Sequence, residues 1–124
     1  MEATAFSLIV IRTAGIEASL AFYTALGLNF IQEQHGSGPI HYSCDLGGIV
    51  MEIYPASGSG SAPEPRSAGA TMLGFKVASL TDTLAELKAL GYEPKTAPKE
   101  AEWGLWVNIA DPDGRLVQLN QPVD

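Results

Sequence analysis

The sequence predicts an α+β protein built from two copies of a βαβββ module that face each other across a groove. The main observation is an internal repeat with an offset of about 64 residues, a long period that is typical of pseudo-symmetric folds. Residues 8–27 (LIVIR to ALG) correspond to residues 72–91 (MLGFK to ALG). A second observation is that one helical segment and several strand-like segments recur in the same order in each copy.

The first module is predicted at residues 4–55 and opens with an apolar, β-branched strand. A helix follows, because apolar residues recur with the 3.6-residue helical period and Gly27 stands where it can end the helix. Gly47 and Gly48 predict a turn between the last two strands. The expected strands are Phe6–Arg12, Leu28–Gln32, Ile40–Leu46 and Ile49–Tyr54, and the expected helical face is Ile16, Leu20, Tyr23 and Leu26.

The second module is predicted at residues 70–122, after a Gly/Ser/Pro-rich linker at residues 56–69. Ser79 to Asp82 resembles a helix capping box, and Asp111 to Gly114 is typical of a tight turn. The expected strands are Thr71–Val77, Tyr92–Lys95, Leu105–Ala110 and Leu116–Asn120, and the expected helical face is Leu80, Leu84, Leu87 and Leu90. We expect residues 1–124 to form a single domain.

Composition and charge restrict the classes of function. The net charge of −7 argues against nucleic acid and anionic membranes as partners, and it permits a cationic ligand. The single cysteine, Cys44, excludes an internal disulfide, and we expect it to be a small packed residue. Residues 1–5 lack a basic region followed by an apolar stretch, so we expect no secretory signal and a cytoplasmic location.

Strand alternation assigns one face of each sheet to the helices and the other to the groove. Glu52 is the one charged residue in an apolar strand, so it is either exposed or held by a partner, and its equivalent in the repeat is Gln118. The expected helix-side residues are Ile9, Ile11, Ile49, Met51, Ile53, Leu73, Phe75, Val107, Ile109, Val117 and Leu119. The expected groove residues are Leu8, Val10, Arg12, Val50, Glu52, Tyr54, Met72, Gly74, Lys76, Trp106, Asn108, Leu116, Gln118 and Asn120.

Two segments resemble the vicinal oxygen chelate superfamily, which includes glyoxalase I, extradiol dioxygenases and bleomycin-binding resistance proteins. Residues 16–28 (IEASLAFYTALGL) resemble its opening motif DLExSLxFYxxxLGL. Trp103-Gly104 and residues 111–119 (DPDGRLVQL) resemble its closing motif, WG followed by DPDGNxIEL. The resemblance implies a glyoxalase/bleomycin resistance-like fold, in which the modules form a curled mixed sheet around a cavity. It also implies a homodimer.

The enzymes of this superfamily hold a divalent metal through the first and last strands of each module. Residue by residue, the resemblance places those ligands at Leu8, Glu52, Met72 and Gln118. Leu and Met side chains are not ligands for hard or borderline divalent ions, and two oxygen donors fall short of the three protein ligands of a catalytic zinc site. We therefore expect no metal or other cofactor.

Three functions remain open at this stage. The first is a protein that binds a small, cationic or aromatic molecule in a metal-free cavity. The second is a metal-dependent lyase, isomerase or dioxygenase that uses Glu52 and Gln118 as ligands, with His41 as a further donor. The third is a metal-free enzyme with Glu52 as general base. The expected ligand-binding residues are Leu8, Val10, Arg12, His41, Glu52, Tyr54, Met72, Trp103, Trp106, Asn108 and Gln118.

Overall fold

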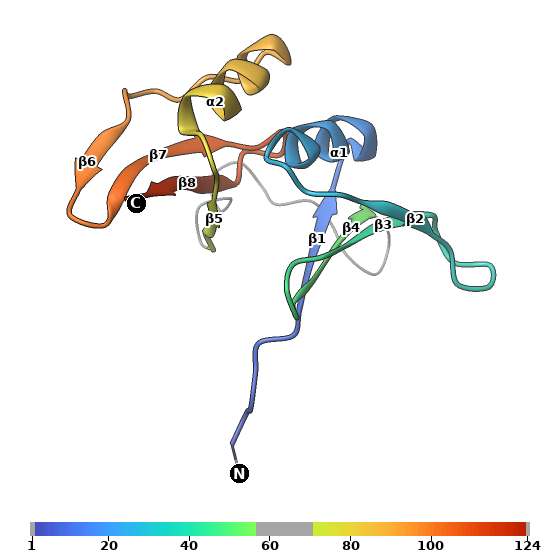
Figure 1. Cartoon of the computed structure of the whole chain (residues 1–124). Helices are drawn as coiled ribbons and strands as arrows, with labels where there is room; N and C mark the ends of the chain where they lie inside the picture. Colours follow the sequence, from blue (N-terminus) through green and yellow to red (C-terminus); the bar gives the residue numbers. More distant parts are fainter. Residues whose placement is uncertain (1, 57–70, 124) are drawn as a thin grey trace.

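The computed structural model describes residues 2–56 and 71–123 (Figure 1). The predicted linker at residues 56–69 lies outside the described residues, except for Ala56. Module one contains the predicted elements in the predicted order. Its elements are β1 (Leu8–Thr13), α1 (Ile16–Ala25), β2 (Ile31–Glu33), β3 (His41–Asp45) and β4 (Val50–Pro55).

Module two repeats this order. Its elements are β5 (Leu73–Lys76), α2 (Leu80–Ala89), β6 (Lys99–Ala101), β7 (Gly104–Ala110) and β8 (Leu116–Pro122). The half of the predicted capping box in which Ser79 accepts is confirmed, because the Asp82 N–H donates to Ser79 Oγ at 3.1 Å. Gly27 and Gly91 follow the two helices with φ of 99° and 98°, a conformation that favours glycine.

The prediction of a strand at Tyr92–Lys95 was wrong. These residues form a loop, and the strand lies further along the chain, where Lys99 pairs with Trp106 on β7. Pro94 and Pro98 have no N–H to donate to a sheet ladder, which is consistent with a strand that starts only after Pro98. Tyr92 instead packs its ring edge-on against Phe22 of α1, with ring centroids 5.3 Å apart.

Each module forms a mixed sheet of four strands. The strand orders are β1-β4-β3-β2 and β5-β8-β7-β6, so the two sheets have the same topology. In each sheet the first and last strands of the module are parallel neighbours, and the other neighbours are antiparallel. The repeat in the sequence is therefore a repeat of complete supersecondary units, as predicted.

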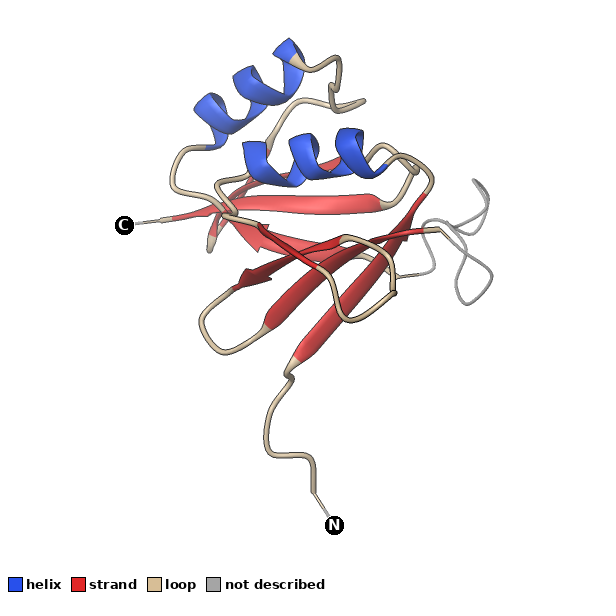
Figure 2. Ribbon diagram, turned by 90° about the vertical axis from the view of Figure 1, so that its right-hand side faces the viewer, coloured by secondary structure: helices blue, strands red, loops and turns tan. Residues whose placement is uncertain are grey.

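Both helices lie side by side on the same side of the sheets (Figure 2). The predicted assignment of strand faces is confirmed on the helix side. Met51, Ile53, Val117 and Leu119 are fully buried, while Ile9, Leu73 and Phe75 pack against the core at its margin. Cys44 is buried in the same core, as expected. The opposite faces of both sheets are left to carry polar and aromatic groups.

Aromatic rings join the two modules in the core. Tyr23 and Phe22 of α1 contact each other with ring centroids 5.1 Å apart. Tyr23 also packs on Phe75 of β5 at 6.0 Å, and Phe22 packs on Tyr92. Helix α1 thus contributes its apolar face to both halves of the protein, and such pairs favour edge-to-face geometry.

A buried group of polar and charged side chains lies where the two modules meet. The Tyr23 hydroxyl donates to Asp111 Oδ2 at 2.7 Å, and Arg115 Nη1 donates to the same oxygen at 3.0 Å. Asp111 Oδ1 accepts from the backbone N–H groups of Asp113 and Arg115, both at 2.9 Å. The carboxylate of Asp111 therefore has four donors although it is almost completely buried.

The other end of this group holds the backbone of module one. Arg115 donates through Nη2 to the Arg12 carbonyl oxygen at the end of β1. Asp113 accepts from the Ala14 N–H at 3.0 Å and from Arg115 Nη1 at 3.0 Å. The closing turn of module two is thus bonded to both β1 and α1 of module one. Within residues 2–56 and 71–123, neither helix has the length and apolar character needed to cross a membrane.

We predict that Tyr23→Phe lowers the free energy of unfolding by about 1–3 kcal/mol, because it removes a buried hydrogen bond to a charged group. Urea unfolding measures the change. Tyr92→Phe is the matched control, since the Tyr92 ring packs on the same Phe22 and its hydroxyl has no partner among the described residues. Equal losses in the two variants would show that the bond from Tyr23 to Asp111 contributes nothing to the junction.

Stability should also fall in alkaline solution because of Tyr23. Burial, and then the charge of Asp111, raise the pKa of Tyr23 well above its ordinary value of 10.0. Above about pH 10 the unfolded chain releases the tyrosine proton while the native state keeps it. The Tyr23 contribution is therefore complete below this pH and is lost above it, by about 1.4 kcal/mol per pH unit. Urea unfolding at several alkaline pH values should show a shallower decline in Tyr23→Phe, and parallel declines would contradict this assignment.

Candidate functional site

The register of module one brings several predicted groove residues into adjacent rows on the sheet face away from the helices. Arg12 of β1 is paired with Tyr54 of β4, and Glu33 of β2 is paired with His41 of β3. In the neighbouring row, Glu52 of β4 is paired with Val10 on one side and with Ser43 on the other. Side chains of paired residues point to the same face, so these rows form one surface.

Three side chains of this surface are stacked on one another. The His41 and Tyr54 rings are nearly parallel, at an angle of 9° with centroids 4.1 Å apart. The Arg12 guanidinium lies over the other side of the Tyr54 ring, 4.7 Å from its centroid, within the range of a cation–π contact. The Tyr54 hydroxyl and His41 Nε2 are 3.3 Å apart. The stack fixes the position of the imidazole.

Glu52 lies within ion-pair distance of His41, so of the two alternatives that the sequence left open, the structure favours a carboxylate with a neighbour over a fully exposed one. Its Oε2 lies 3.7 Å from His41 Nε2, and its side chain is 17% exposed. Glu33 Oε1 approaches the same nitrogen to 3.5 Å. His41 itself is only 1% exposed, so its Nε2 is shared between two carboxylates in a largely enclosed position. We refer to Arg12, Glu33, His35, His41, Glu52 and Tyr54 as the module-one cluster.

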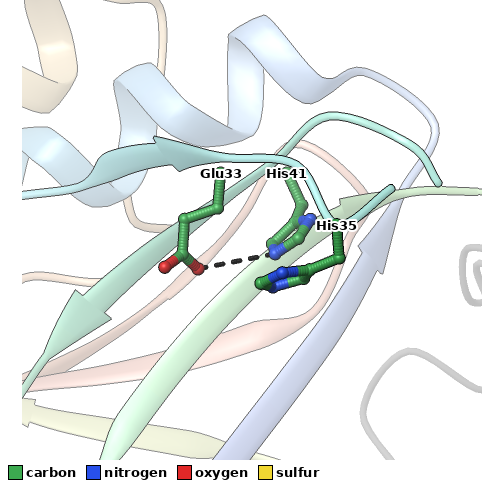
Figure 3. A group of neighbouring side chains, drawn as sticks. All are labelled: Glu33, His35 and His41. Atoms are coloured by element: carbon green, nitrogen blue, oxygen red, sulfur yellow. Dashed lines mark ion pairs between the residues drawn. The ribbon is translucent and has the colours of Figure 1, made fainter. Parts of the chain in front are cut away.

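Sequence reasoning missed two members of this cluster, Glu33 and His35. Figure 3 shows their side chains pointing toward His41 from the end of β2 and from the loop that follows it. One ligand atom from each of Glu33, His35 and His41 lies within 4.8 Å of the others. The signal was present in the sequence, because Glu33 and His35 are two positions apart, at the spacing that places strand residues on one face.

The corresponding sheet face of module two is apolar and aromatic. A cavity of about 420 Å³ lies between β7, β8 and the loop before β6, and its wall includes Trp106, Asn108 and Leu116. The ring centroids of Trp103 and Trp106 are 6.5 Å apart, and the angle between the ring planes is 27°. Lys99 Nζ lies 5.4 Å from the Trp106 ring centroid. We refer to this space as the module-two cavity.

Asn108 is the most informative polar residue of this cavity. Its register partner is Gln118, the position equivalent to Glu52 in the repeat. Asn108 Oδ1 is buried, and none of the described residues donates a hydrogen bond to it. A buried acceptor without a donor costs free energy, and such atoms are rare in native proteins. Because Asn108 also contributes to the cavity wall, a rotation of its side chain would bring this acceptor to an N–H or O–H group in the cavity.

The four positions that the superfamily uses for its metal do not form a metal site here. Leu8 and Met72 are half exposed on the same faces and have no oxygen or nitrogen donor to offer. Glu52 is turned to His41, and Gln118 lies on the face of module two beside Gly74 and Asn108. The donor set does not fit a divalent ion.

The predicted ligand-binding residues therefore fall into separate groups. Arg12, His41, Glu52 and Tyr54 belong to the module-one cluster, and all their described contacts with one another stay within module one. Trp106 and Asn108 line the module-two cavity, Trp103 stacks on its wall, and Gln118 is next to Asn108. Leu8, Val10 and Met72 are exposed apolar residues of β1 and of the segment before β5.

A further depression of about 700 Å³ lies on the helix side. It is lined by residues of α1 and α2 and by Tyr42, and its acidic residues are Glu17 and Glu86. Although it is larger, it lies between the two helices and is separated from the predicted groove residues. The module-two cavity has an aromatic wall and a buried acceptor without a donor among the described residues. Ligand sites typically combine an apolar and aromatic lining with a few polar groups.

The fold is shared with several solved structures. TnmS3, an antibiotic binding protein from Streptomyces sp. CB03234, has a TM-score of 0.71 and 20% identity, over 99% of both chains. A glyoxylase/bleomycin resistance protein/dioxygenase domain from Frankia sp. EAN1pec has a TM-score of 0.70 and 19% identity, over 98% of this chain and 100% of the other. A bleomycin resistance determinant encoded on the transposon Tn5 has a TM-score of 0.63 and 20% identity, over 96% and 98% of the two chains.

No curated protein sequence matches the chain at a significant level. The sequence profile of one family, however, matches almost its entire length, from residue 5 to residue 119. The match includes both motifs that carried the resemblance in the sequence, and the repeated strand order agrees with it. The chain therefore belongs to the glyoxalase/bleomycin resistance protein/dioxygenase superfamily.

Proposed function

We propose that this protein binds a small aromatic molecule with N–H or O–H donors in the module-two cavity, without a metal at the superfamily positions. The observation that carries the proposal is the buried Asn108 Oδ1, which lacks a donor among the described residues and belongs to a residue in the cavity wall. A volume of about 420 Å³ is within the range of small-molecule sites.

The aromatic character of the ligand follows from the cavity wall. Trp106 offers a large flat surface, and Leu116 adds an apolar one on β8. Lys99 already lies over the Trp106 ring, which supports one face of the indole. A flat ligand that packs on Trp106 and donates to Asn108 would satisfy both features at once.

The charge of the cavity decides between classes of ligand. The whole chain carries a net charge of −7, which taken alone favours a cation. The cavity itself is lined by Lys95 and Lys99 against Glu93. Local charges act more strongly than distant, screened ones, so we propose a neutral or anionic aromatic ligand.

The structural relatives support binding as the activity. TnmS3 is described as an antibiotic binding protein, and the Tn5 protein is described as a bleomycin resistance determinant. We infer from this likeness that the present chain also acts by holding a small molecule.

The single cysteine of the chain, Cys44, is buried, which is consistent with a location in the reducing cytoplasm.

We also propose that the protein forms a homodimer through exposed apolar residues of the sheets. Leu8, Val10, Met72 and Leu116 are all exposed, and β1 and β5 are edge strands of their sheets. Edge strands with exposed apolar side chains are normally covered in native proteins. A second copy of the chain would cover them.

Thermal-shift measurements over a panel of cationic, neutral and anionic aromatic compounds should identify a ligand, because binding raises the unfolding temperature. We expect Trp106→Ala to weaken the binding of that ligand at least about 10-fold. Asn108→Leu should also weaken it while leaving the free protein as stable or more stable, since it removes an unpaired buried acceptor. Isothermal titration calorimetry and urea unfolding measure the two effects.

Leu90→Ala is the control for these variants, because Leu90 lines the depression between the helices. It should leave the affinity unchanged. If Leu90→Ala weakens binding and Trp106→Ala does not, the ligand occupies the helix side and the proposed site is wrong.

Light scattering coupled to size exclusion should give twice the chain mass of 13.1 kDa. Val10→Lys places a charge on the exposed edge strand and should shift the protein toward the monomer. Thr81→Lys, at an exposed position on α2, should leave the mass unchanged. A monomeric wild-type protein at micromolar concentration would refute the dimer.

A further inference from the structure

We propose that Glu33, His35 and His41 bind a Zn²⁺ ion on the β2–β3 hairpin, separately from the four positions that the superfamily uses for its metal. Two imidazole nitrogens and one carboxylate oxygen make a donor set that suits zinc and would leave an open position. The inference goes beyond the proposed function, because neither the module-two cavity nor its ligand is part of it.

The distances are close to those of a coordination shell. Two ligands of a tetrahedral zinc ion, each about 2.0–2.1 Å from the metal, are about 3.4 Å from each other. His41 Nε2 and Glu33 Oε1 are 3.5 Å apart, and the three ligand atoms lie within 4.8 Å of one another. His35 is an exposed loop residue, so a side-chain rotation is enough to close the remaining gap.

The hydrogen bonding of His41 directs its other nitrogen toward the ion. Nδ1 lies 3.2 Å from the Pro39 carbonyl oxygen. A carbonyl oxygen can only accept, so this contact is a hydrogen bond when Nδ1 carries the hydrogen. In the neutral ring, Nε2 is then the lone-pair nitrogen, and it faces Glu33 and Glu52. Metal-bound histidines typically donate their second ring N–H to a backbone carbonyl in this way.

The charges of the cluster also favour a cation. The carboxylates of Glu33 and Glu52 both lie beside His41 Nε2, and the Tyr54 hydroxyl, 3.3 Å from the same nitrogen, is a neutral donor that does not balance their charge. A divalent ion would balance the two carboxylate charges. Glu52 would add negative charge next to the site, at 3.7 Å from His41 Nε2.

Bound zinc would have a structural consequence for the hairpin. The ligands enclose residues 34–40, so the ion would link the end of β2 to the start of β3 across the intervening loop. Glu33 and His41 lie at the two ends of this loop and His35 lies within it, and Figure 3 shows the three side chains close together. Binding to the folded state alone would raise the thermal stability in proportion to the logarithm of the zinc concentration.

The test uses the full chain without an affinity tag, dialysed against a chelator and then titrated with Zn²⁺ by calorimetry. We expect one ion per chain, and we expect Co²⁺ to give the visible absorption of a tetrahedral site. His35→Gln should weaken zinc binding at least about 10-fold, because it removes a ligand from an exposed position that is not needed for folding. Gln118→Leu is the matched control at a superfamily position and should not change it.

Three results would overturn the proposal. The first is a wild-type protein that takes up no zinc. The second is zinc binding by His35→Gln with wild-type affinity. The third is loss of zinc in Gln118→Leu, which would place the ion at the superfamily positions. Ligand binding in the module-two cavity is measured separately on Trp106→Ala, so failure of either idea is distinguishable from failure of the other.

Discussion

The buried carboxylate of Asp111 is the constraint on which the arrangement of the two modules depends. Tyr23 and Arg115 both bond to it, and Arg115 continues to the backbone of β1. Removing one partner of a buried ion pair such as Asp111 and Arg115 typically costs about 3–5 kcal/mol, a large share of the roughly 5–15 kcal/mol that stabilises a domain. Burial alone would lower the pKa of Arg115, but its bonds to Asp111 and Asp113 raise it above the ordinary value, so the guanidinium stays charged.

Because the helix-side faces of the sheets are buried in the core, the opposite faces are available for binding. The two modules use them differently although their strand orders are the same. Module one presents a stacked and ionic surface around His41, whereas module two presents Trp106 and Asn108 around a cavity. The repeat thus specifies where side chains stand, while the residues at those positions decide the chemistry. This division is common, because function belongs to sites on a fold and not to the fold.

Most of the fold could be predicted because it rests on local periodicity. The alternation in β4 and β8 identified their core faces, and the helical spacing identified Tyr23, Leu26, Leu80 and Leu87, all of which are buried. The helical prediction was wrong for Leu90, which is 45% exposed, and it left out Phe22, which is fully buried. The strand at Tyr92–Lys95 was misplaced, since apolar character around Tyr92 reflects packing on Phe22 and not strand pairing. The partners of Asp111 and His41 could not be foreseen, because they are set by register and by contacts over long sequence separations.

Glu52 links the superfamily pattern to what is particular to this chain. At a superfamily metal position, a carboxylate would share an ion with three other ligands, yet Leu8 and Met72 offer none. A partly buried carboxylate still needs a positive partner, and in this structure it turns to His41, where Glu33 competes for the same nitrogen. Without the other superfamily ligands, Glu52 therefore contacts His41 instead. The cation that we propose for Glu33, His35 and His41 would lie beside Glu52, on the β2–β3 hairpin. Gln118 is uncharged and needs no such partner, which agrees with the neutral or anionic aromatic ligand that we propose for module two.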